Sequence, residues 1–297
     1  MVCREIMDKI EERYPKRYAL EWDNVGLQVG RCDKEVSRIY IALDATDEVI
    51  EEAADWGADM LITHHPMIFK AMKQINDTHF IGRRVLKLIQ NDISYYAMHT
   101  NYDVMGMADL AGEILEMKNA QVLDVTCVES GRGRGAREEK RKVEMGLEIT
   151  GEGIRNTEDD PEQTAGEEHE EGIGRVADLD KEMSLRECCS FVKEKFHLPN
   201  VKVFGDPDMR VHRLAVSPGS GKSVIRTALG KGADVLITGD IDHHEGIDAV
   251  AQGMAVMDAG HYGIEHIYIA DMKRFCEENF KKVEVRTAAI RHPFWIM

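Results

Sequence analysis

The sequence lacks most of the features that mark secreted, redox or membrane proteins. It contains 6 cysteines, and no two of them form a CxxC pair. We therefore predict six reduced thiols rather than a dithiol redox motif or a cysteine zinc site. No apolar run approaches the roughly 20 residues that a membrane-spanning helix needs, and the N-terminal segment has no signal-peptide core. We expect a cytoplasmic protein without a membrane partner.

Positive charge is also scarce. The chain has 38 Lys and Arg residues against 54 Asp and Glu residues, which gives a formal net charge of -16. Because nucleic acids carry dense negative charge, a chain this acidic has no general attraction to them, and we expect no nucleic-acid partner. At roughly 100–200 residues per domain, a chain of 297 residues forms one large domain or two smaller ones.

The two halves of the sequence share one pattern. Residues 39–63 align without a gap with residues 214–238, and both segments end in Gly-Ala-Asp-Xaa-Leu-Ile-Thr. Each segment is typical of a strand–helix–strand unit, and a further strand ending in a histidine follows at residues 93–99 and 255–261. Chance similarity of two such units is the alternative. The repeat predicts an α/β fold of two pseudo-repeated lobes that face one another, each a sheet with flanking helices.

A segment of different composition separates the two halves. Residues 129–142 are rich in glycine and mostly basic, whereas residues 158–171 are strongly acidic. We predict a first α/β lobe at 1–125, a charged hairpin-like insert at 126–172 and a second α/β lobe at 173–297. Charge runs of this kind usually form a solvated surface segment, although the insert could also have a binding role.

The strongest chemical signal is the segment ADMLITHHPMIF (58–69), in which an apolar strand ends in His64 and His65. In open α/β sheets, ligands bind beyond the carboxyl ends of the strands. A single histidine at such a place is more often structural, but two in succession favour a metal site. Adjacent side chains on an extended segment point to opposite sides, so the pair favours two ions about 3.5–4 Å apart.

Two further strand ends carry residues that bind metals. His99 and Asp103 follow one strand, and His261 and Glu265 follow its counterpart in the second half. His261 and Glu265 are four residues apart, which places both on one face of a helix. Imidazole and carboxylate ligands suit zinc, iron, manganese, cobalt or nickel, and the spacing does not choose among these divalent ions.

Other polar residues near these segments could hold ligands in position or contact a substrate, but an ordinary structural role is an equal alternative. They are Asp44, Thr63, His99, Asn101, His243 and His244. The segment PGSGKS (218–223) looks like a phosphate-binding loop. The full motif requires a glycine where Val216 stands, so we predict a tight turn there.

Five motifs in order, WDNVGL, ITHHPMIF, HTNYD, GDIDHHEGIDA and GHYGIE, resemble those of the Nif-three-like dinuclear metal proteins, also named GTP cyclohydrolase 1 type 2 homologues. The resemblance covers roughly 1–125 and 172–297. It implies two divalent metal ions with Glu265 between them, and a toroidal homohexamer whose metal centres face an internal cavity. The metal ligands that it implies are His64 and Asp103 for one ion, His65 and His261 for the other, and the shared Glu265.

Two functions stay open at this point. One is a metal-dependent hydrolase, in which a metal-bridging water attacks a phosphate ester, an amide or a ring C–N bond of a small molecule. The family name implies GTP cyclohydrolase-like activity as a specific version of this function. The other is a non-catalytic protein that binds or delivers metal, or forms a ring-shaped scaffold. An open coordination position favours the hydrolase, with His99, Asn101 and His244 as candidate partners of the metal-bound water.

Overall fold

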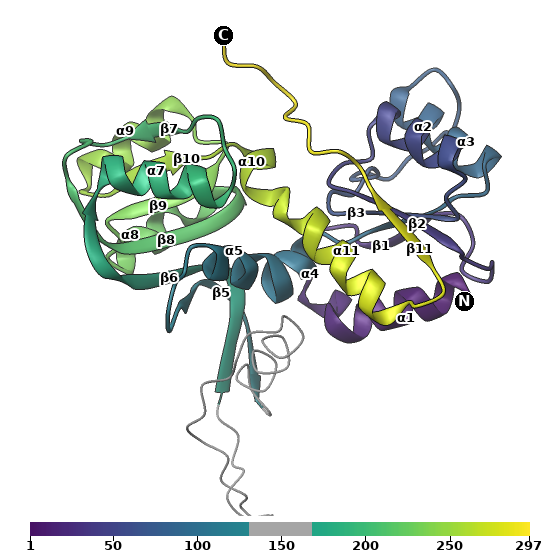
Figure 1. The fold of residues 1–297 in the computed structure, drawn as a ribbon, viewed down its shortest axis with the longest axis horizontal. Helices are drawn as coiled ribbons and strands as arrows, with labels where there is room; N and C mark the ends of the chain where they lie inside the picture. The colour runs from purple at the N-terminus through teal and green to yellow at the C-terminus, as the bar shows by residue number, and fades with distance from the viewer. Residues whose placement is uncertain (131–167) are drawn as a thin grey trace, which may run out of the picture.

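The computed structural model describes residues 1–130 and 168–297, and it contains two α/β lobes side by side (Figure 1). The first lobe is built on a five-stranded sheet in the order β1-β4-β3-β2-β11, and the second on a six-stranded sheet in the order β5-β6-β8-β9-β10-β7. Helices flank both sheets. The predicted fold class, with two sheets flanked by helices, is confirmed.

The first sheet is mixed. Strands β11, β2, β3 and β4 run parallel to one another, and the edge strand β1 pairs with β4 in the antiparallel sense. The strands are β1 (Gly26–Val29), β2 (Arg38–Ala42), β3 (Met60–Thr63), β4 (Ser94–Ala97) and β11 (Glu284–Thr287). The helices that surround it are α1 (Cys3–Arg13), the short η1 (Lys16–Tyr18), α2 (Asp47–Trp56) and α3 (Phe80–Gln90).

The second sheet has a parallel centre, in which β8, β9 and β10 lie side by side. Its strands are β5 (Gln121–Ser130), β6 (Glu168–Ser184), β7 (Lys202–Phe204), β8 (Arg210–Ser220), β9 (Val235–Gly239) and β10 (Ala255–Asp258). Its helices are α7 (Leu185–Lys195), η3 (Gly221–Val224), α8 (Ile225–Gly230), α9 (His243–Ala251) and α10 (His261–Glu265). Antiparallel β5 and β6 flank the predicted insert, most of which (131–167) lies outside the described residues.

The repeated sequence segments form matching units. The β2–α2–β3 and β8–η3–α8–β9 units each place two parallel strands beside one another, and β4 and β10 then extend the sheets in the same direction. Local signals set the ends of the helices. The Thr46 side chain accepts a hydrogen bond from the Val49 amide at the start of α2, and Gly57 closes the helix at φ 73°.

The remaining helices connect the lobes. They are α4 (Thr100–Tyr102), the π-helical turn η2 (Asp103–Met107), α5 (Ala108–Ile114) and α11 (Ile267–Asn279). Helix α11 runs from the second lobe towards the first (Figure 1). One cluster of buried residues includes Ile41 of β2, Leu214 of β8 and Met272 of α11, so a continuous apolar core joins both sheets. The last strand, β11, then completes the first sheet although it comes from the end of the chain.

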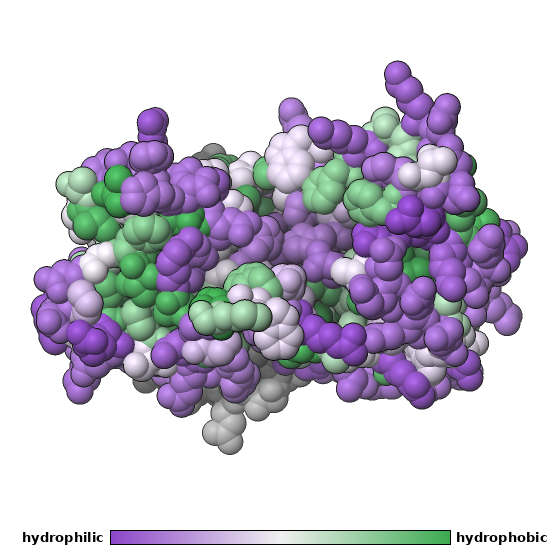
Figure 2. Space-filling model, turned by 90° about the horizontal axis from the view of Figure 1, so that it is seen from above, coloured by the Kyte–Doolittle hydropathy of each residue, from purple (hydrophilic) through white to green (hydrophobic). Residues whose placement is uncertain are grey.

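Hydrophilic side chains predominate on the face seen in Figure 2, with smaller groups of hydrophobic side chains among them. No helix within residues 1–130 and 168–297 is long and apolar enough to cross a membrane. All six cysteines are free thiols, as predicted.

Candidate metal centre

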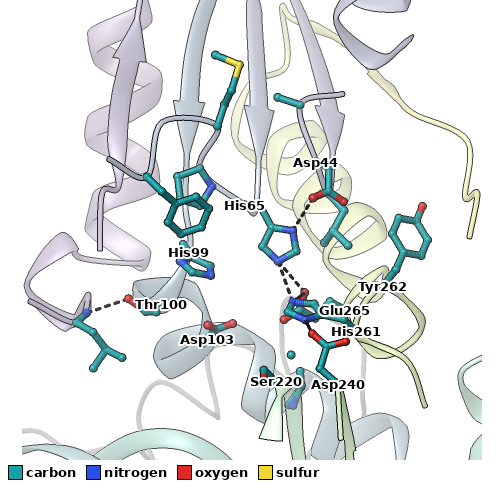
Figure 3. Close-up of a pocket in the computed structure, with 18 of the residues that line it drawn as sticks. Asp44, His65, His99, Thr100, Asp103, Ser220, Asp240, His261, Tyr262 and Glu265 are labelled. Carbon is teal, nitrogen blue, oxygen red and sulfur yellow. Dashed lines mark hydrogen bonds and ion pairs between the residues drawn. The ribbon is translucent and has the colours of Figure 1, made fainter. Parts of the chain in front are cut away.

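The predicted metal ligands meet where strands of both sheets end, between the two lobes. His64 and His65 directly follow β3, Asp103 begins the π-helical turn after β4, and His261 and Glu265 are the first and last residues of α10. In Figure 3, His65, His261 and Glu265 point towards one another, and Asp103 lies on the opposite side of Glu265 from Asp44. The structure therefore brings together side chains that are up to 201 positions apart, from His64 to Glu265.

The first group of possible metal donors is the more deeply buried of the two. His64 is completely buried, and its Nε2 atom lies 3.3 Å from Asp103 Oδ1 and 3.7 Å from Glu265 Oε1. Although these atoms are close, neither ring nitrogen of His64 has the alignment of a hydrogen bond to any described residue, and the same holds for Asp103 Oδ1. Burying a polar atom without a partner costs free energy. A cation bound among these three side chains would supply the missing partner.

The second group is partly open to solvent. Glu265 Oε2 lies 3.0 Å from His65 Nε2 and 3.1 Å from His261 Nε2, and the two Nε2 atoms are 3.2 Å apart. The side chains of His65 and His261 are 17% and 33% exposed, whereas that of Glu265 is 3% exposed. Three possible electron-pair donors thus converge on one small volume.

A carboxylate behind each of these histidines sets its tautomer. Asp44 Oδ1 lies 2.8 Å from His65 Nδ1, and Asp240 Oδ2 lies 2.7 Å from His261 Nδ1. When each neutral ring donates its Nδ1 hydrogen to the carboxylate, the lone pair of Nε2 faces the centre. This is the arrangement in which metal-binding histidines are normally held, so the residues present fit a metal ion.

The electrostatics of the cluster favour positive charge. Burial lowers the pKa of His65, but Glu265 and Asp44 outweigh this effect and raise the pKa to about 10. Burial likewise opposes protonation of His64 and His261, yet the neighbouring carboxylates raise both pKa values to about 9. For Glu265, burial raises the pKa, but the three histidines hold it well below its usual value. A metal ion would supply the positive charge that protons otherwise provide.

The donor atoms can be grouped in more than one way. Among the described residues, three sets have ligand atoms within 4.8 Å of one another: His64 with Asp103 and Glu265, His65 with His261 and Glu265, and His64 with His65 and His99. The first two share Glu265 and match the grouping implied by the family resemblance. The geometry shows groups that can hold metal ions, while the number and identity of the ions stay predictions.

His99 is held beside these groups by Asp23, a residue that our sequence analysis did not single out. Its Nδ1 atom lies 2.9 Å from Asp23 Oδ1, and Asp23 Oδ2 accepts hydrogen bonds from the amide and hydroxyl of Thr100 at 2.9 and 2.5 Å. Burial raises the pKa of Asp23, but these hydrogen bonds lower it to about 2. In the sequence, the motif WDNVGL, which contains Asp23, could have indicated this residue.

The other candidate positioning residues have different surroundings. Asn101 is buried and links its side chain to the His99 amide and to the carbonyl of Tyr14, at 3.0 and 2.8 Å. Asn101 therefore shapes the segment that carries His99. His243 and His244 lie at the exposed start of α9, and neither is among the described residues that line the pocket beside the centre.

Asp240 is a second carboxylate of the site that was not predicted from the sequence. Extending the alignment of the two repeats by two residues pairs Asp240 with His65, so the repeat contained the signal. Asp240 adopts a left-handed conformation with φ 55°, which aspartate tolerates better than most residues, and this turn places its carboxylate behind His261.

A pocket of about 850 Å³ opens beside the centre. His65, Asp103, His261 and Glu265 lie in its wall. The segment PGSGKS (218–223) lies beside Glu265 in this wall, and it forms the last residues of β8 and most of η3 rather than the predicted tight turn. A pocket of this size suits a small-molecule ligand.

The fold and the site together define an α/β protein with a candidate metal centre between two lobes. The chain belongs to the Duf34/NIF3 (NGG1p interacting factor 3) family, whose model matches residues 1–293. The family predicted from the motifs is therefore confirmed.

Individual relatives support the same assignment over nearly the whole chain. A "GTP cyclohydrolase 1 type 2 homolog" from Clostridium acetobutylicum is 32% identical over 286 residues, covering 96% of this chain and 92% of that protein. One from Bacillus subtilis is 31% identical over 327 residues, covering 87% and 88%. A solved structure of a Bacillus cereus protein related to NIF3 has a TM-score of 0.83 and 28% identity, covering 100% and 99%.

Proposed function

We propose that this chain is a hydrolase that depends on two divalent metal ions and acts on a small molecule. The observation that carries the proposal is the position of Glu265, which two donor groups share in the wall of a pocket of about 850 Å³. His64 and Asp103 would complete one metal position, and His65 and His261 the other. Two such ions supply Lewis-acid chemistry, since they lower the pKa of a bound water and polarise the bond that is attacked.

The chain's own residues prepare this chemistry. Asp44 and Asp240 keep His65 and His261 in the tautomer that turns Nε2 towards the centre. His99 is oriented in the same manner by Asp23, so its Nε2 atom carries the free lone pair beside the donor groups. In this position His99 can accept a proton from a nucleophile or return one to a leaving group.

A hydrolase screen of the metal-loaded chain tests the proposal. The panel contains phosphate esters, amides and cyclic compounds with a ring C–N bond, and each active compound is assayed again with the double variant His65→Ala, Glu265→Ala. We expect the activity to fall by at least about 100-fold, because each metal position loses a donor. His212→Ala, at an exposed position of β8, serves as the control histidine variant. Unchanged activity in the double variant would refute the catalytic assignment.

Metal delivery is the second candidate, and one observation favours it. The side chains of His65 and His261 are 17% and 33% exposed, whereas that of His64 is completely buried. One metal position is therefore more accessible than the other. Rapid transfer of one ion to a colorimetric chelator, without activity on any compound of the panel, would favour delivery over hydrolysis.

The assembly and location of the protein belong to the same proposal. A toroidal homohexamer would place several metal centres around one cavity, and light scattering of the purified chain tests this directly. A monomer at micromolar concentration would contradict it. We further propose a cytoplasmic location, which fractionation of the source cells would test.

A further inference from the structure

Two exposed aromatic side chains stand in the pocket beside His99. Trp22 is 61% exposed and Phe69 is 50% exposed, and both line the pocket. Their ring centroids lie 5.8 and 5.7 Å from that of His99, with interplanar angles of 74° and 90°. Single exposed apolar residues are common, but two aromatic rings that converge on one imidazole inside a cavity form a surface for a flat ligand.

The charged side chains of the pocket indicate which charge a ligand can carry. Four carboxylates line it, from Asp44, Asp103, Asp240 and Glu265. The four positive charges of two divalent ions would balance them. Among the described lining residues, Arg84 is the one permanently cationic side chain, and its Nε atom is already 2.8 Å from Asp47 Oδ1. For a chain of phosphates, the described lining thus offers no lysine and one arginine, which already pairs with Asp47.

The wall across from His99 carries uncharged polar side chains beside the carboxylates of Asp240 and Glu265. Ser217, Ser220 and Ser223 line it together with Gly219. Figure 3 shows Ser220 on the same side of the pocket as Asp240, across from His99. Hydroxyl groups both donate and accept hydrogen bonds, so this wall suits the ring nitrogens and carbonyl groups of a polar, neutral ring.

We propose that the pocket binds an uncharged planar heteroaromatic compound of the nucleobase or nucleoside type, rather than a nucleoside triphosphate. The ring stacks against Trp22 and Phe69, and its polar edge meets His99 and the serine wall. This inference rests on the proposed function, because it places the ring beside the metal centre. It departs from the substrate in the name of the relatives, since GTP carries a triphosphate, and apart from the metal ions the described lining offers it one arginine, which is paired with Asp47, and no lysine.

Calorimetric titration of the full, metal-loaded chain tests the proposal, with guanosine and GTP as probes. We expect guanosine to bind, and Trp22→Leu or Phe69→Leu to weaken binding about 5- to 150-fold, the range that base–aromatic stacking provides. Trp56→Phe is the matched control, because Trp56 packs near Tyr40 and beneath Arg286, away from the pocket. We expect GTP to bind less than tenfold more tightly than guanosine.

The outcomes separate this inference from the proposed function. Guanosine binding that survives Trp22→Leu and Phe69→Leu unchanged, or GTP binding more than tenfold tighter than guanosine, would overturn the inference. Hydrolysis of an acyclic ester that is insensitive to both variants would also overturn it while leaving the hydrolase intact. Conversely, Trp22-dependent guanosine binding without turnover of any panel compound would support the inference and refute the hydrolase.

Discussion

At the scale of single residues, the centre depends on which ring nitrogen each histidine turns inward. His65, His99 and His261 each have a carboxylate at Nδ1, supplied by Asp44, Asp23 and Asp240. These partners come from different parts of the chain and act in the same way. A carboxylate fixes the tautomer and the ring orientation, and the opposite nitrogen becomes the functional one.

Asp44→Asn tests this orienting role. The amide keeps the size of the side chain but removes the negative charge that holds His65 Nδ1. We expect affinity for zinc to fall about 10- to 100-fold, measured by competition with a chromogenic chelator. Asp92→Asn is the control, because Asp92 pairs with Arg31 at the surface. Equal affinities in both variants would mean that Asp44 has no influence on the metal.

Asp23 gives a pH-dependent prediction. Its pKa lies at about 2 in the folded protein instead of 3.8, so the folded state favours its ionised form. The resulting stability is fully present above about pH 4 and is lost as the pH falls towards 2. The shift corresponds to about 2 kcal/mol. We expect Asp23→Asn to lower the free energy of unfolding by this order at pH 7 and by less at pH 3, measured by urea titration.

A difference that stays equal at pH 7 and pH 3 would contradict the ionisation argument. It would show that the variant acts through lost packing or through the hydrogen bonds to Thr100 instead. Glu51→Gln, at an exposed position of α2, provides a control for the loss of a surface carboxylate.

At the scale of elements, the turn of the backbone at Gly219, near the end of β8, has a defined role. Gly219 has φ +78°, and a Cβ atom there would lie 2.6 Å from Glu265 Oε1. The alignment of the repeats pairs Gly219 with Asp44. At this position of the repeat, the first lobe has Asp44, which orients His65. The second lobe has Gly219, which lets the backbone approach Glu265.

Gly219→Ala measures how much that close approach matters. Gly232→Ala is a matched control, because Gly232 has φ +69° and no described atom lies within 4 Å of its Cβ position. Each variant should lose about 1 kcal/mol of stability through backbone strain. Only Gly219→Ala should also weaken metal binding, since the methyl group displaces Glu265. Equal metal affinity in the two variants would refute a role for the turn in placing Glu265.

At the scale of the whole molecule, the centre and the packing of the two lobes depend on the same helix. Tyr268 of α11 is fully buried, and its ring lies 5.2 Å from that of His64. The same helix contributes to the apolar core that joins both sheets. Helix α11 therefore contacts a candidate metal ligand and also packs in the core that joins the lobes. Metal binding should for this reason stabilise the arrangement of the lobes.

Removal of metal tests this coupling. A ligand present at about 100 times its dissociation constant stabilises the folded state by about 2.7 kcal/mol. We expect EDTA to lower the melting temperature of the metal-loaded chain by several degrees, measured by calorimetry. Glu265→Gln removes the charge that both donor groups share, so EDTA should have a much smaller effect on that variant. A full EDTA effect in Glu265→Gln would place the stabilising metal elsewhere.

Much of the site could be predicted because its signals are local. The repeat of strand, helix and strand follows from side-chain periodicity, and the carboxyl ends of parallel strands are where ligands bind. These two rules placed candidate ligands at the strand ends, and the family resemblance then selected five of them, which are His64, His65, Asp103, His261 and Glu265. The two rules were also enough to predict two α/β lobes and to separate both from the charged insert.

The sequence by itself thus determined the repeated units, the residue types at the strand ends and the family. Only the tertiary structure decided which carboxylate orients which histidine, that Trp22 and Phe69 meet at His99, and that β11 completes the first sheet. The physical reason is the distance along the chain. Periodicity reports how a segment faces its own sheet, whereas these contacts join segments that are separate in the sequence and meet only when the chain folds.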